Sequence, residues 1–329
     1  MTIERGASAF FSRVVLACSG GLNSSVAIRW LAERHGAEVV AVTMDLGQGK
    51  DVLEEIRDRA LAVGALRAHV VDVRDAYVRD HLVRGLKAGI LRHHGAPMAA
   101  PLSWPLIARQ LVEIARIEQA AAVAHGDRAG HDAPIEKTVR AVDQALTILA
   151  PAGEWQMDDA QLVAFARERH VLLPAAMIGG VAAKSAAPLP GEAALVDLGF
   201  DRGVPTAING VVMNAPDLIA SLDILTAAHG VPDGPLGALH MAHAALQETA
   251  IAADARLFAA RVADEYVRIL RDGGWFSRSR HALDAYVDAI EHDVGGVARL
   301  KLFQGECAIA SCRLQLKPVT IAFAQASRS

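Results

Sequence analysis

Residues 13–25 read Arg-Val-Val-Leu-Ala-Cys-Ser-Gly-Gly-Leu-Asn-Ser-Ser, a β-branched run that passes through two glycines into a helix-like stretch. The run Arg13–Cys18 predicts a buried strand, and Asn23–His35 has the pattern of a helix. A strand that enters a helix through Ser-Gly-Gly places backbone N–H groups and the positive helix end around an anion. Gly20 and Gly21 have no Cβ, so a phosphate can approach the main chain closely. We therefore predict a phosphate-binding loop; an ordinary glycine turn with a serine cap is the alternative.

Strand and helix patterns keep alternating through the first half of the chain. Further buried strands are expected at Glu38–Met44, Ala68–Val73, Ala120–His125 and Thr147–Ala150. Helices are expected at Asp51–Val63, Asp75–Leu91, Trp104–Gln119 and Ile135–Leu146. Near-continuous apolar strands separated by helices are typical of a parallel sheet covered on both faces. The sequence thus predicts an α/β fold, with a nucleotide-binding domain over residues 1–173 and the loops after its strands on one edge.

The pattern changes after Pro174. Residues 174–191 are rich in Ala, Gly, Pro and Ser and predict a connector or a lid. Hairpins are expected at Leu195–Phe200 with Thr206–Ile208 and at Val297–Phe303 with Glu306–Leu314. Helices are expected at Ala215–His229, at Arg280–Glu291 and at Leu239–Arg271, which is long enough to be broken. Strands and helices no longer alternate, so residues 174–329 are predicted to form an α+β second domain.

The composition excludes several classes of protein. The chain has 329 residues, of which 52% are hydrophobic and 21% charged, so it can bury a large core. Its formal net charge of −4 is too balanced for a protein that wraps nucleic acid. No apolar stretch approaches the roughly 18 residues of a membrane span. The charge and the lack of a long apolar stretch predict a protein without nucleic-acid or membrane partners. Three cysteines fit a reducing compartment, so we expect the protein to be cytoplasmic.

Several segments of the sequence resemble argininosuccinate synthases. They are residues 14–31, Val40–Gly49, Pro105–Ala115, Ala124–Gly126, Gly203–Gly210, Gly274–Ser277 and Val297–Phe303. The resemblance spans nearly the whole chain. It implies an adenine nucleotide α-hydrolase-like domain followed by a synthetase and oligomerisation domain. Members of the family use ATP to adenylate the ureido oxygen of citrulline, and the amine of aspartate then displaces AMP.

The resemblance also implies which residues contact ATP. Met44 falls where the family contacts adenine, and Gly126 where the fourth strand meets the nucleotide. The expected nucleotide contacts are Ala17, Ser19, Gly20, Gly21, Leu22, Asn23, Ser24, Ser25, Met44 and Gly126. Met44 as plain core and Gly126 as a turn glycine are the alternatives, and their place at the carboxyl edge favours the ligand role.

Departures from the family fall on residues that would hold Mg²⁺ and the substrates. Asn23 replaces an aspartate that faces Mg²⁺, so we expect ATP binding with a weakened Mg²⁺ requirement. Ala96 replaces a citrulline-binding tyrosine, and Trp104 replaces an arginine. Arg128 replaces a threonine of the aspartate site, and Glu136 replaces a substrate-binding arginine.

These changes predict an altered pocket for small, amino-acid-like substrates other than citrulline and aspartate. Its expected residues are Ala96, Asp127, Arg128, Asp132 and Glu136. His131 and Asp132, directly after the fourth strand, are the candidates for a general base. The histidine pairs His93-His94 and His125/His131 match no zinc spacing, so no metal site is predicted.

Two classes of function remain open. The first is a ligase that forms AMP and pyrophosphate, favoured by the preserved Ser-Gly-Gly-Leu-x-Ser-Ser. The second is a non-catalytic homologue that keeps the fold and binds nucleotide, favoured by Asn23 and the altered aspartate site.

Features of the second half predict the assembly. Val231–Gly237 stands where the family has a longer segment with further citrulline contacts, and the chain ends at Ser329, before the arm that embraces family tetramers. The stretch Leu239–Arg271 carries apolar residues on more than one side, which suggests a second contact surface. We therefore expect a homo-oligomer, a dimer or a tetramer looser than that of the relatives.

Overall fold

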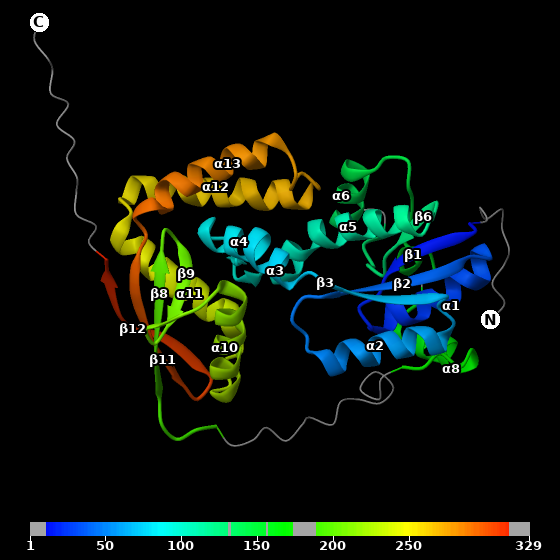
Figure 1. The fold of residues 1–329 in the computed structure, drawn as a ribbon, viewed down its shortest axis with the longest axis horizontal. Coiled ribbons are helices and arrows are strands. Elements are labelled where there is room, and N and C mark those ends of the chain that lie inside the picture. The colour runs from blue at the N-terminus through cyan, green and yellow to red at the C-terminus, as the bar shows by residue number, and fades with distance from the viewer. Residues whose placement is uncertain (1–10, 131–132, 156, 174–188, 316–329) are drawn as a thin grey trace, which may run out of the picture.

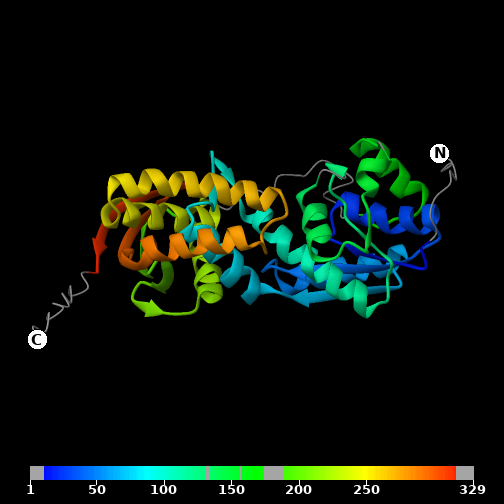
Figure 2. The same ribbon diagram turned by 90° about the horizontal axis from the view of Figure 1, so that it is seen from above.

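The computed structural model describes residues 11–130, 133–155, 157–173 and 189–315. Figures 1 and 2 show two layered bodies along the long axis, with a parallel sheet at one end and an antiparallel sheet at the other. The predicted connector 174–191 and the candidates His131 and Asp132 lie wholly or largely outside the described residues. Within the described ranges, no helix is both long and apolar enough to cross a membrane.

The first body is built on a five-stranded parallel sheet of order β3-β2-β1-β6-β7. Its strands are β1 (Arg13–Ala17), β2 (Glu38–Asp45), β3 (Arg67–Asp72), β6 (Ala122–Ala124) and β7 (Thr147–Leu149). The helices around it are α1 (Leu22–His35), α2 (Lys50–Val63), α5 (Ala99–Ile117), α6 (Pro134–Val142), α7 (Pro151–Glu154) and α8 (Asp159–Glu168). The predicted parallel α/β fold is confirmed.

Alternate residues of the strands bury opposite faces of this sheet. Val14 and Leu16 pack into the cluster that contains Val26 of α1 and Ile56 of α2. Val15 instead belongs to the larger core that includes residues of α5 and α6. The strand order reverses between β1 and β6, because β2 lies on one side of β1 and β6 on the other. Open α/β sheets bind ligands outside the carboxyl ends of the strands at such a point.

The segment after β3 differs from the single helix predicted over Asp75–Leu91. It consists of α3 (Arg74–Tyr77), a π-helical turn η1 (Val78–Leu82) and α4 (Val83–Lys87). The helix ends early because Gly89 takes a left-handed φ of 71°, and the Ile90 N–H then bonds back to the Gly85 carbonyl. A two-stranded hairpin follows, β4 (Arg92–His93) and β5 (Ala96–Pro97).

The second body is a five-stranded antiparallel sheet of order β10-β9-β8-β11-β12 with helices packed against it. Its strands are β8 (Ala194–Asp201), β9 (Val204–Ile208), β10 (Val211–Val212), β11 (Gly296–Phe303) and β12 (Glu306–Leu314). Its helices are α10 (Ala215–Ala228), α11 (Gly234–Ala250), α12 (Ala253–Arg271) and α13 (Arg278–Ile290), with a 3₁₀ turn, η3 (Glu291–Asp293). Both predicted hairpins are present, and β8 joins them into one sheet by pairing with β11.

The long helix predicted over Leu239–Arg271 is broken in two. Ile251 is extended, with φ −107° and ψ 133°, so α11 ends there and α12 begins after Ala252. The break lets both segments bury apolar side chains, such as Leu246 on α11 and Tyr266 on α12. Leu257 and Phe258 on α12 stay exposed, at 71% and 51%.

Candidate functional site

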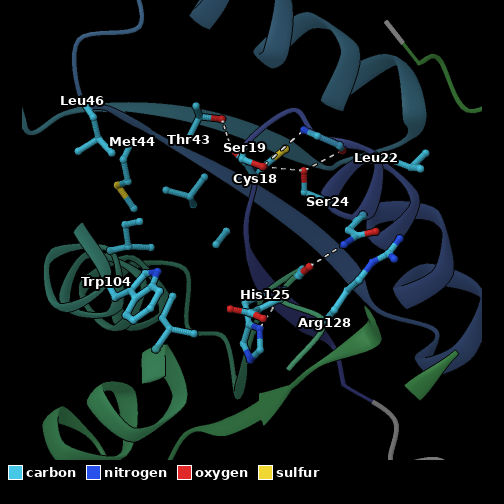
Figure 3. A pocket seen from close by; sticks show the side chains of 18 of the residues that line it. Cys18, Ser19, Leu22, Ser24, Thr43, Met44, Leu46, Trp104, His125 and Arg128 are labelled. Carbon is cyan, nitrogen blue, oxygen red and sulfur yellow. Dashed lines mark hydrogen bonds between the residues drawn. The ribbon is translucent and has the colours of Figure 1, made fainter. Parts of the chain in front are cut away.

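A cavity of about 750 Å³ opens at the carboxyl edge of the parallel sheet, beside β1 and β6. Figure 3 shows the loop after β1 on one side of it, Met44 and Trp104 on a second and His125 with Arg128 on a third. Helix α8 completes the wall with Asp159 and Val163. The site thus draws on segments spread over about half of the chain.

The loop after β1 is held open toward this cavity. The Cys18 N–H donates to the Val42 carbonyl at 2.8 Å, and the Thr43 hydroxyl donates to the Cys18 carbonyl at 2.9 Å, which keeps the loop paired to β2. Gly21 is the N-cap of α1 in an extended conformation. The first N–H groups of α1 therefore have no intrahelical acceptors, and together with the helix dipole they can accept an anion.

Hydroxyl groups flank these amides. The Ser24 hydroxyl donates to the Gly21 carbonyl at 3.1 Å and lies 3.4 Å from the Ser19 hydroxyl. Ser19 and Ser24 both line the cavity, whereas Ser25 is buried in α1 and does not line it. The loop thus presents two serine side chains next to the helix terminus.

Gly20 shapes the back of the loop. Its φ of 73° is left-handed, and a Cβ there would lie 2.5 Å from Cγ1 of Ile56 on α2. Arg59, one turn further along α2, donates to the Gly20 carbonyl at 3.4 Å and pairs with Glu55. Gly20 therefore does not line the cavity; it lets the loop pack against α2, which brings a guanidinium behind the anion site.

Cys18 does not have the properties of a nucleophile. Its side chain is buried, and burial raises the pKa of the thiol. Hydrogen bonds from the loop and the charge of Arg59 oppose this shift without reversing it. A protonated thiol fits a packing role for Cys18.

Asn23 joins the phosphate loop to the loop after β6. Its side-chain amide donates to the Gly126 carbonyl at 3.0 Å. A Cβ on Gly126 would lie 3.3 Å from both the Asn23 Cβ and the Ser24 nitrogen, so glycine allows this close approach. The position that the resemblance assigns to Mg²⁺ thus supports a contact between two loops, which a carboxylate could not make because it cannot donate.

His125 lies at the bottom of the cavity with both ring nitrogens engaged. Its Nδ1 accepts the Asp127 N–H at 3.3 Å, so the ring proton is on Nε2, which lies 3.3 Å from Glu136 Oε1. Glu136 is fully buried and also pairs with Arg140, 3.2 Å from its other oxygen. Glu136 orients the imidazole from behind and does not line the cavity, contrary to the expectation that its charge faces a substrate.

An exposed ion pair and an apolar wall also line the cavity. Arg128 pairs with Asp159 across the opening, and both side chains are more than half exposed. The Asp127 carboxylate accepts the Ala129 N–H at 2.8 Å and thereby caps its own turn. The apolar wall consists of Val42, Met44, Leu46, Trp104, Ile107 and Ile135.

Most of the nucleotide contacts expected from the sequence come together here. Those that line the cavity are Ala17, Ser19, Gly21, Leu22, Asn23, Ser24, Met44 and Gly126, joined by Asp127 and Arg128 of the expected substrate residues. Ala96 is elsewhere: it is exposed on the β4–β5 hairpin and does not line the cavity. Asp159 and Val163 were not expected, because nothing in the sequence of α8 indicates which side chains reach the cavity.

A glycine loop entering a helix at the reversal point of a parallel sheet defines an α/β nucleotide-binding fold. Residues 13–172 match the model of the argininosuccinate synthase N-terminal HUP domain, and residues 233–317 match that of the family's C-terminal domain. Argininosuccinate synthases of Bacillus mycoides (strain KBAB4) and Bacillus thuringiensis (strain Al Hakam) are 30% identical over 347 residues, covering 90% of this chain and 86% of each relative. The chain belongs to the argininosuccinate synthase family.

Proposed function

We propose that this chain is an ATP-dependent carbon–nitrogen ligase. A ureido or carbonyl oxygen of one substrate attacks the α-phosphorus of ATP, and the bond to pyrophosphate breaks. An amine then attacks the activated carbon, AMP leaves with that oxygen, and the amine releases a proton. The observation that carries the proposal is the α1 N-terminus, which opens between Ser19 and Ser24 into a cavity large enough for a nucleotide and a second ligand.

The cavity suggests an orientation for the nucleotide. The α1 amides and the serine hydroxyls would take the phosphates, because they supply donors at the positive helix end. Met44, at the end of β2, would contact adenine through the apolar wall. Gly126 would contact the nucleotide beside β6, since it lines the cavity next to Asn23 and Ser24. Calorimetry with ATP tests this step, and no binding at millimolar ATP would contradict it.

The residues fit Mg²⁺ only in part. A hard cation prefers carboxylate oxygens, and Asn23 offers an amide whose NH₂ group is already bonded to Gly126. The nearest carboxylates of the described cavity wall are engaged, Asp127 with its own turn and Asp159 with Arg128. We therefore infer that the ion is held mainly by the ATP phosphates and that its requirement is weakened.

The two substrates are proposed to differ from citrulline and aspartate. Trp104 presents an apolar face where the family has a cation, and the charge of Arg128 is compensated by Asp159. Glu136 has turned inward to His125, which removes a substrate contact rather than reversing its charge. Each charge-assisted hydrogen bond lost costs about 1.5–3 kcal/mol, so little affinity for those two amino acids remains.

A second candidate is a homologue that binds nucleotide without turnover. The Asn23–Gly126 hydrogen bond favours this candidate, because Asn23 stands where the family has a metal-facing carboxylate and its amide is used in a structural contact. The two candidates differ in pyrophosphate release: a ligase releases it when the correct substrates are present, and a binding protein never does.

We also propose an arrangement of roles along the chain. Residues 1–173 bind the nucleotide, and residues 174–329 support the substrates and contacts between copies of the chain. The exposed Leu257 and Phe258 on α12 support a homo-oligomer, since they are neighbouring apolar side chains left uncovered on this helix.

A further inference from the structure

The β4–β5 hairpin and helix α12 bring together two histidines and a carboxylate. Nε2 of His93 lies 3.6 Å from Oδ1 of Asp264, and Nε2 of His94 lies 3.7 Å from the same oxygen. One ligand atom from each of the three residues falls within 4.8 Å of the other two. Asp264 is 170 positions beyond His94 in the sequence, so the cluster exists only in the fold.

These separations suit a coordinated ion. Two ligands about 2.1 Å from a tetrahedral zinc ion lie about 3.4 Å apart, close to both measured nitrogen–oxygen distances. His94 and Asp264 are well exposed, at 81% and 61% of their side chains, so small rotations can bring their ligand atoms closer. His93 is nearly buried, at 13%, and would be the fixed ligand.

We propose that His93, His94 and Asp264 bind a divalent transition-metal ion of the zinc class, with water completing the coordination. Imidazole nitrogens select zinc, copper or nickel over magnesium and calcium, which prefer oxygen ligands. Three protein ligands leave an open position, so the site is built for exchangeable binding rather than as a closed structural centre. The inference is independent of the proposed ligase activity.

The hairpin turn brings the two histidine rings together, with their centroids 4.1 Å apart. His94 and Gly95 form the two-residue turn with φ values of 48° and 80°, as a type I′ turn requires. Arg92 fixes the turn by donating to the Gly95 carbonyl at 2.7 Å and by pairing with Asp233. The ligands are thus partly organised before an ion arrives.

A metal here would connect the β4–β5 hairpin to helix α12. The hairpin leads directly into α5, whose Trp104 and Ile107 line the cavity, while Asp264 belongs to α12. An ion on all three residues would fasten the entry of α5 to α12. We expect bound zinc to raise the thermal midpoint of the full chain.

Isothermal titration of the full chain with ZnCl₂ tests the site. The wild type should bind one equivalent, and His94→Asn and Asp264→Asn should each weaken this binding at least tenfold. His292→Asn is the matched control, because His292 lies 2.9 Å from Asp293 in a histidine–aspartate contact elsewhere on the surface. It should leave zinc affinity unchanged.

The same titrations define what would overturn the proposal. Zinc bound by the three cysteines would persist in both variants, so unchanged affinity in His94→Asn and Asp264→Asn refutes the site. Absence of wild-type binding at submillimolar zinc refutes it as well. Both altered residues are exposed, so circular dichroism should show that the variants fold like the wild type. Weaker zinc binding in these variants would then come from loss of the ligand and not from unfolding.

Discussion

The side-chain amide of Asn23 on α1 donates to the carbonyl oxygen of Gly126, across 103 positions of the sequence. This bond holds the loop after β6 against the start of α1, so it connects two sides of the cavity. A residue assigned from family likeness to metal binding thus has a visible structural task. The balance between these two roles is open to measurement.

Asn23→Asp should remove the hydrogen bond to Gly126 and supply a carboxylate for Mg²⁺. A carboxylate cannot donate to the Gly126 carbonyl, so the free energy of unfolding should fall by about 1–3 kcal/mol. The new carboxylate should also make ATP affinity depend more strongly on Mg²⁺. Urea unfolding and calorimetry with and without Mg²⁺ measure both effects. Asn23→Ala is the control, because it loses the hydrogen bond to Gly126 without gaining a carboxylate. Equal Mg²⁺ dependence of ATP affinity in Asn23→Asp and wild type would contradict a metal-binding role for position 23.

Gly20→Ala should disrupt the phosphate loop. Its left-handed backbone costs about 1–2 kcal/mol with any L side chain, and the clash with Ile56 adds about 1–3 kcal/mol. Gly47→Ala is the matched control, because Gly47 is also left-handed and a Cβ there meets nothing within 4 Å. Gly20→Ala should therefore destabilise the chain more than Gly47→Ala and also weaken ATP binding. Equal losses in the two variants would show that contact with α2 is unimportant.

We expect the free energy of unfolding to fall in mild acid because of the buried imidazole of His81. Its ring stacks on Trp275 at a centroid distance of 5.2 Å, and burial lowers the pKa of His81 from an ordinary 6.5 to about 4. As the pH falls, the imidazole at position 81 is therefore protonated in the unfolded chain before it is protonated in the folded chain. The stability that neutral His81 contributes is complete above pH 6.5 and is lost as the pH falls toward 4. The full effect is on the order of 3 kcal/mol.

His81→Phe tests this by keeping a ring on Trp275 and removing the titration. Unfolding free energies measured between pH 7 and 4 should vary less in the variant than in the wild type. Asp72, whose pKa is lowered to about 2 by its hydrogen bonds with Arg74, titrates below this window and is unchanged in the variant. Identical pH profiles between 7 and 4 would contradict the assignment.

Leu257→Glu should weaken self-association. Leu257 is 71% exposed on α12, and a charge there disfavours an apolar contact with a second copy. Light scattering after size exclusion should give a dimer or larger mass for the wild type and a smaller one for the variant. Ile117→Glu is the control, since Ile117 is 78% exposed at the end of α5 in the other body. A wild-type mass of one chain at micromolar concentration would refute the oligomer.

The sequence predicted the parallel sheet because β-branched runs such as those of β1 and β2 are buried on both faces and separated by amphipathic helices. It also predicted which loops meet, because the carboxyl ends of parallel strands share an edge. The sequence did not predict where side chains point when their direction depends on tertiary packing. Glu136 turns inward because α6 begins at Pro134 and places that position against His125. The Arg128–Asp159 pair joins segments that no local pattern connects.

Pyrophosphate and AMP release from ATP tests the central claim most directly. The wild type would be incubated with Mg²⁺ and a panel of ureido or carbonyl compounds paired with amines, with citrulline plus aspartate included. The proposed ligase should release both products in equal amounts with at least one pair, and only slowly with citrulline plus aspartate. ATP binding without pyrophosphate release from any pair would contradict a ligase and favour a nucleotide-binding homologue, whereas rapid turnover of citrulline plus aspartate would contradict the altered substrates.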